Sequence, residues 1–296
     1  MKIALCFLIS YQHKLNKEEL WKKWIQPNND IINIYFHYKD INKIQSKWIL
    51  KHAIPSSHIV KTSYFHVVPA YISILSYAYF NDQSNTWFCL LTESCVPIIT
   101  PDQFRKLFFE NYKSSIFNWS NAWWNVQIHR RANLQLLTKD LRLGHDPWFT
   151  LKREHVFYCI NFVKTNNKMF NMICSGGLAN ESVFAIILKI NNQLDNGSIL
   201  NYSSTATDWT RMTSSTSPHL FKDGNTQDIQ YINNFIKKNS YVIFLRKVDS
   251  EFPDIILNNY ITNKSTHNIT INDIIFYILI AILLFFSIII IIYIIL

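Results

Sequence analysis

The sequence predicts an α/β fold with a mainly parallel central sheet, followed by a transmembrane helix. Two observations lead to this prediction. Short apolar runs alternate with stretches of helical periodicity through the first hundred residues. Residues 274–296 then form an apolar run without a charged side chain. We therefore expect one large domain and a hydrophobic C-terminal segment.

The elements of the domain follow from periodicity and from helix-start signals. Residues 3–9, 31–37 and 86–92 are largely apolar runs, which are typical of buried strands. Residues 17–24, 67–80 and 101–109 place apolar residues at helical spacing, and the last stretch begins at a proline. Strands separated by such helices are joined by right-handed crossovers and lie parallel. Further along, we expect a strand at 147–151, helices at 153–163 and 181–190, and a strand at 241–245.

The composition excludes several classes of protein. Of the 296 residues, 49% are hydrophobic and 17% are charged, which excludes a disordered or acidic chain. The chain carries 29 Lys and Arg against 20 Asp and Glu, a net charge of +9. This charge, with the segment that contains Trp123, Trp124, Arg130 and Arg131, leaves nucleic-acid binding as an alternative. However, the lysines are scattered and no recognition motif is present, so no nucleic-acid partner is expected.

The C-terminal run has the length of a membrane span. All residues from 274 to 296 are apolar except Ser287. As a helix, the run would extend about 34 Å, which suffices for a hydrocarbon core of about 30 Å. A buried core helix is the alternative, but the run is too long and too uniform for one. We therefore predict a domain at 1–258, a juxtamembrane linker at 259–273 and a single-pass anchor at 274–296.

The orientation in the membrane follows from the two ends of the chain. The first ten residues are apolar but short, and no small-residue cleavage site follows them. They fit a buried strand better than a signal peptide. A span at the C-terminal end would leave the domain in the cytosol, and a lumenal domain is the alternative.

Six segments carry side chains suited to chemistry, and they follow one another in a fixed order. They are 3–13 with His13; 34–37 with His37; 88–98 with Glu93 and Ser94; 147–156 with Trp148 and Arg153; 179–181 with Glu181; and 244–247 with Arg246 and Lys247. In this order they resemble the core-2/I-branching β-1,6-N-acetylglucosaminyltransferase family (glycosyltransferase family 14), which includes xylosyltransferases and plant relatives. The resemblance runs from about residue 2 to 248, nearly all of the expected domain.

The resemblance implies a GT-A-like nucleotide-sugar fold and an inverting transfer from a UDP-sugar to a glycan or glycoprotein hydroxyl. Glu181 would be the general base. Donor-binding residues would be His13, His37, Glu93, Ser94, Arg246 and Lys247, and the acceptor would lie against Trp148 and Arg153. On general grounds Glu181 could instead be a carboxylate that stabilises a helix start, and Trp148 could be a core residue.

No metal or other cofactor is expected. Many nucleotide-sugar transferases bind a divalent metal through an Asp-x-Asp pair, and the sequence contains none. Members of the resembled family use basic side chains instead, and Arg246 and Lys247 stand at the matching place. A guanidinium binds phosphate oxygens as a fork, whereas an ammonium acts as a compact charge.

Two positions depart from the family pattern. Lys39 stands where the family has an aspartate, with Asp40 next to it, and Asn180 replaces the aspartate before the expected base. Three functions therefore stay open. The first is transfer of GlcNAc, the second is transfer of xylose or another sugar on the same fold, and the third is a catalytically decayed glycan-binding protein.

Overall fold

The computed structural model describes residues 1–9, 12–63, 65–111, 113–214 and 216–262. Its main sheet has six strands in the order β2-β1-β3-β8-β5-β9. In chain order these are β1 (Lys2–Ile9), β2 (Ile32–Tyr38), β3 (Asn85–Thr92), β5 (Ser115–Ile116), β8 (Thr150–Lys152) and β9 (Ile199–Leu200). β1 lies parallel to β2 and β3, and β9 lies parallel to β5, whereas β8 runs antiparallel to its neighbours. The predicted mainly parallel sheet is confirmed.

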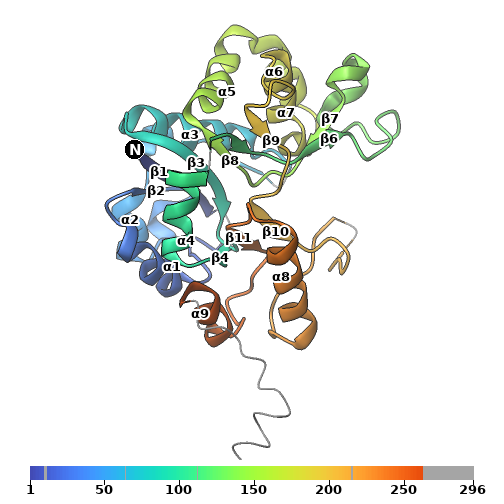
Figure 1. The fold of residues 1–296 in the computed structure, drawn as a ribbon. Coiled ribbons are helices and arrows are strands. Elements are labelled where there is room, and N and C mark those ends of the chain that lie inside the picture. The colour runs from blue at the N-terminus through green and yellow to red at the C-terminus, as the bar shows by residue number, and fades with distance from the viewer. Residues whose placement is uncertain (10–11, 64, 112, 215, 263–296) are drawn as a thin grey trace, which may run out of the picture.

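Helices cover both faces of this sheet (Figure 1). They are α1 (Glu18–Ile25), α2 (Lys47–His52), α3 (Val68–Asn81), α4 (Pro101–Lys106), α5 (Arg153–Thr165), α6 (Asn167–Cys174), α7 (Val183–Ile190), α8 (Thr226–Lys238) and α9 (Asp254–Thr262). In β1, Leu5 and Phe7 pack in one core cluster with residues of α1 and α4. The alternating Ala4 and Cys6 pack in a second cluster with α3, α5 and α7. A continuous apolar strand is therefore required, because both faces of β1 are buried.

Two smaller sheets lie beside the main one (Figure 1). One contains β10 (Thr205–Thr207), β11 (Phe244–Arg246) and β4 (Val96–Pro97), and the other contains β6 (Trp119–Asn121) and β7 (Leu143–His145). β4 follows β3 after a short turn and pairs with β11. This pairing brings the late strand β11 next to the end of β3.

The structure corrects several predicted boundaries. The strand expected at 147–151 begins only at Thr150, since Pro147 has no N–H to donate to a ladder. The helix expected at 181–190 begins at Val183, because Leu178 adopts a left-handed conformation and a 3-10 turn, η7 (Ala179–Glu181), follows it. The linker expected from 259 begins inside α9, which buries Leu257 and Ile261. The folded domain therefore extends at least to residue 262.

The predicted membrane anchor at 274–296 lies outside the described residues, as does most of the linker. Within the described part of the chain, no helix is long and apolar enough to cross a membrane.

Candidate active site

The carboxyl ends of β1, β2 and β3 lie side by side. Leu8 of β1 is in register with His37 of β2 and with Thr92 of β3. Ligands of open α/β sheets collect at this edge. The residues that follow these strands are therefore the first candidates for a binding site.

His13 and His37 accept hydrogen bonds from backbone amides at this edge. The Asp40 amide donates to His13 Nε2 at 3.1 Å, and the Val60 amide donates to His37 Nε2 at 3.3 Å. Burial lowers the pKa of His37 to about 4, so the ring is a neutral acceptor. Asp40 and Val60 also line one open pocket, together with Tyr38, Lys39, Ile59 and Lys61.

Arg246, the last residue of β11, is held by the end of β3 and by an aromatic ring. Its guanidinium carbon lies 3.6 Å from the centre of the Trp148 ring, and its Nε donates to Thr92 Oγ1 at 3.3 Å. The Ser94 carbonyl accepts the Val248 amide at 2.9 Å. The guanidinium is therefore fixed by stacking and by a hydrogen bond, in a plane set by Trp148.

Glu93, Arg246 and Lys247 form a charged group at this position. Burial raises the pKa of Glu93, and the two cations oppose that rise. Burial also lowers the pKa of Lys247, with a further contribution from the Arg246 charge. Asp249 also acts on Lys247, so two carboxylates lie near the two cations. The Arg246 charge still disfavours the charged form of Lys247, and an anionic ligand beside both cations would offset this repulsion.

Glu181 lies in the η7 turn and is paired with an arginine. Arg131 Nη1 donates to Glu181 Oε2 at 3.3 Å, and in the described residues no group donates to Oε1. Burial raises the pKa of Glu181, Arg131 opposes this shift, and the nearby Asp146 adds to it. Only 18% of the Glu181 side chain is exposed, so water screens the charges of Arg131 and Asp146 only weakly at this carboxylate. A carboxylate with one free oxygen and a raised pKa is suited to accept a proton.

Tyr71 of α3 connects the Glu181 region with the Arg246 region. Its buried phenol interacts electrostatically with Arg246, Glu93 and Glu181, and burial raises its pKa well above the usual range. Its ring also stacks on Phe184 of α7, three residues after Glu181. The Glu181 carboxylate and the Arg246 guanidinium therefore both lie within electrostatic range of the same phenol.

The model of the family described as Core-2/I-Branching enzyme matches residues 5–233 of the chain. The chain belongs to this family. The protein is therefore a glycosyltransferase of the hexosyl- or acetylglucosaminyltransferase type, with a nucleotide-sugar donor and a glycan acceptor. The match includes Glu181 and ends before Arg246, so the place of Arg246 in the site rests on the contacts described above. No curated protein matches the chain significantly.

In this Core-2/I-Branching enzyme, the structure brings together most of the predicted site residues. Glu93, Ser94, Arg246 and Lys247 meet where β3 and β11 end. His13 and His37 lie at the same edge of the sheet, next to the Lys39 pocket.

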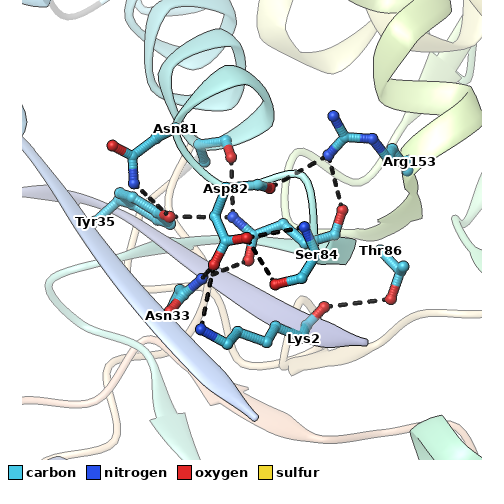
Figure 2. A network of polar contacts seen from close by, with 10 residues as sticks. Lys2, Asn33, Tyr35, Asn81, Asp82, Ser84, Thr86 and Arg153 are labelled. Carbon is cyan, nitrogen blue, oxygen red and sulfur yellow. Dashed lines mark hydrogen bonds and ion pairs between the residues drawn. The ribbon is translucent and has the colours of Figure 1, made fainter. Parts of the chain in front are cut away.

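Trp148 and Arg153, the two residues predicted to contact the acceptor, lie in different parts of the fold. Trp148 is only 7% exposed, and its ring supports Arg246. Arg153 donates to the backbone carbonyls of Tyr79, Asp82 and Asn85, and its guanidinium lies 3.7 Å from the Tyr79 ring. Figure 2 shows this network at the end of α3, where Asp82 also binds Lys2. The structure does not bring Arg153 to the site, because its hydrogen-bond donors are occupied at the opposite end of β3.

Sequence reasoning missed three residues of the site, namely Tyr71, Arg131 and Asp146. Arg131 was visible only as part of a basic aromatic segment, and Tyr71 only as one apolar position of a helix. Asp146 is partly buried and accepts from Asn118 Nδ2 at 2.8 Å and from the Ser203 hydroxyl, and desolvation raises its pKa. In the sequence, Asp146 appears only as an aspartate before Pro147, and this pattern does not indicate that its charge acts on Glu181.

A metal site in a protein of this kind would need several His, Cys, Asp or Glu side chains close together. In residues 1–262, apart from the undescribed positions, no three His, Cys, Asp or Glu side chains converge as a metal site would require.

Proposed function

We propose that this enzyme transfers a sugar, with GlcNAc as the first candidate, from a UDP-sugar to a hydroxyl of a glycan or glycoprotein. Transfer occurs by a single displacement that inverts the anomeric carbon. The observation that supports this best is that the Glu181 carboxylate and the Arg246 guanidinium both lie within electrostatic range of the Tyr71 phenol. An in-line displacement needs a base on one side of the sugar and a stabilised leaving group on the other.

Glu181 acts as the general base in this proposal. Its free Oε1 takes the proton of the acceptor hydroxyl while the hydroxyl oxygen attacks the anomeric carbon. The bond from that carbon to the diphosphate oxygen breaks in the same step. The raised pKa of Glu181 supports this role, because a base with a pKa closer to neutrality accepts a proton more effectively.

Arg246 and Lys247 stabilise the departing diphosphate, and we propose that no metal is needed. The guanidinium on Trp148 is fixed in one plane, which allows two parallel hydrogen bonds to phosphate oxygens. Lys247 follows directly and adds a second charge. The missing Asp-x-Asp pair in the sequence supports the same proposal.

The donor nucleotide is proposed to lie at the edge formed by β1 and β2. The Asp40 and Val60 amides fix this edge through His13 and His37. Lys39 lines the pocket there, in place of an aspartate, so the contacts to the base or ribose differ from the usual pattern of the family. A few side chains of the donor pocket, Lys39 among them, determine which UDP-sugar is bound, and UDP-xylose is one of the candidates.

The acceptor sugar is proposed to lie against the aromatic segment between β6 and β7 rather than against Trp148. Trp123 is 59% exposed and contacts the Trp124 ring, and the Trp124 ring in turn contacts Arg131. A Cβ at Gly144 of β7 would clash with the Trp123 ring, so glycine allows this ring to lie on the strand. Exposed aromatic rings next to the base are suited to the apolar face of a sugar.

We also propose that residues 274–296 anchor the enzyme in a membrane by a single span, with the catalytic domain on the cytosolic side. The uncharged apolar run supports an anchor. Protease treatment of sealed vesicles distinguishes the two orientations, because a cytosolic domain is digested and a lumenal domain is protected.

The full-length chain in detergent micelles tests the proposed function. UDP-GlcNAc, UDP-xylose and other UDP-sugars are supplied with a panel of glycan acceptors and EDTA, and UDP release is followed. We expect turnover with one donor, and at least a 100-fold lower kcat for Glu181→Gln, because a well-placed base contributes roughly 10²–10⁴-fold. Glu154→Gln is the matched control, since Glu154 is half exposed in an ion pair with Lys152 and lies away from Glu181. Binding of a UDP-sugar without turnover would instead indicate a decayed enzyme.

A further inference from the structure

Arg131 and Glu181 are held together by the backbone as well as by their charges. The η5 turn (Arg131–Leu136) lies beside the segment that leads into η7. The Ala132 amide donates to the Gly177 carbonyl at 2.9 Å. A Cβ at Gly176 would clash with the backbone of Ala132 and Asn133. Glycine at 176 therefore permits this close approach, which fixes the residues next to Arg131 against those next to Glu181.

The side chain of Arg131 is also fixed from its other side. Its guanidinium carbon lies 5.2 Å from the centre of the Trp124 ring, while its Nη1 reaches Glu181 Oε2. Trp124 itself lies against Trp123. The arginine thus has one preferred position, between the aromatic segment and the candidate base.

We propose that Arg131 is a positioning residue for the general base: its guanidinium holds the Glu181 carboxylate in its ionised form and directs the free oxygen toward the acceptor. This inference rests on the proposed function of Glu181 and deepens it. Arg131 does not exchange a proton or touch the anomeric carbon. It determines the fraction of enzyme in which the base is ready to act.

The titratable groups around Glu181 determine the sign of the expected effect. They are Arg131 of η5, Asp146 after β7 and Tyr71 of α3. Burial and the Asp146 charge favour the protonated acid, and Arg131 is the group that opposes them. When the Arg131 charge is removed, the pKa of Glu181 must therefore rise. The acidic limb of the activity profile should then move to higher pH.

The test compares Arg131→Gln, Arg131→Lys and Arg130→Gln with the wild type in the full-length chain. For Arg131→Gln we expect the acidic limb of kcat/KM to move up by about one pH unit or more, since an opposite charge at this range shifts a carboxyl pKa by roughly 1–3 units. At pH values below the acidic limb, a shift of one unit lowers kcat/KM of the variant about tenfold more than in the wild type, when each enzyme is compared with its own maximum. Arg131→Lys keeps the charge and should stay near the wild-type limb. Arg130 is exposed, so Arg130→Gln should not move the limb.

A second readout does not depend on turnover. The Glu181 carboxyl is titrated by ¹³C NMR with labelled glutamate, and its signal is assigned by its loss in Glu181→Gln. The inference predicts a higher midpoint in Arg131→Gln than in wild type, and thermal melts over the same pH range exclude unfolding as the cause. An equal loss of activity at every pH with an unchanged carboxyl midpoint would overturn it. Failure of the wild type to transfer any sugar would overturn the proposed function instead, while the titration would still decide the role of Arg131.

Discussion

At the scale of single residues, Arg246 shows how one side chain depends on its neighbours for a function. Trp148 supplies the surface on which the guanidinium lies, and Thr92 fixes its Nε. The sequence predicted both Arg246 and Trp148 as site residues, but it did not predict that the Arg246 guanidinium would lie on the Trp148 ring. A motif specifies residue types, whereas the direction of a side chain depends on strands that are distant in sequence, here β11 and the segment before β8.

This arrangement predicts that Arg246→Lys is not a conservative change. The ammonium keeps the charge but loses the planar fork and the stacking on Trp148. We expect kcat/KM for the donor to fall about tenfold or more, as loss of one charged hydrogen bond costs about 1.5–3 kcal/mol. Arg105→Lys is the control, because Arg105 forms its ion pair with Asp30 at 40% exposure. Unchanged donor kinetics in Arg246→Lys would remove Arg246 from the diphosphate site.

At the scale of secondary-structure elements, the first three strands and their helices were predictable, and the later short strands were not. β1, β2 and β3 contain seven or eight residues each, with long apolar runs. β5 and β9 contain two residues each, which is too short for any periodicity to be visible. The start of α7 was misplaced because nothing in the sequence marks Leu178 as left-handed. The candidate base Glu181 therefore lies in the tight η7 turn, before α7 begins, and not in the first turn of that helix.

The end of α3 provides a prediction at this scale, since Arg153 of α5 binds its last turn and the start of β3. Arg153→Met leaves several backbone carbonyls without this donor, at a cost of about 1–3 kcal/mol. The midpoint of thermal unfolding should fall by roughly 2–6 °C, while kcat and the acceptor KM stay unchanged. Lys152→Met, which removes a surface ion pair, should leave the midpoint almost unchanged. A raised acceptor KM at unchanged stability would restore Arg153 to the acceptor site.

At the scale of the whole molecule, the fold gathers residues from both ends of the chain at one edge of the sheet. His13 comes from the first strand connection, Glu181 from the turn before α7, and Arg246 from the last strand. The ordered motifs allowed the family to be predicted, and they included the residues that meet where β3 and β11 end. They could not reveal Arg131, Asp146 or Tyr71, because their contribution arises only when η5, β7 and α3 surround Glu181.

The stereochemistry of the product tests the central claim most directly. The full-length enzyme is incubated with the donor that it turns over, an acceptor glycan and EDTA, and the anomeric coupling of the new linkage is measured by proton NMR. A UDP-sugar with an α linkage should give a β-linked product at the same rate with and without EDTA, since the proposed single displacement inverts the anomeric carbon and uses Arg246 and Lys247 in place of a metal. An α-linked product, or a rate that EDTA abolishes and a divalent metal restores, would contradict this account.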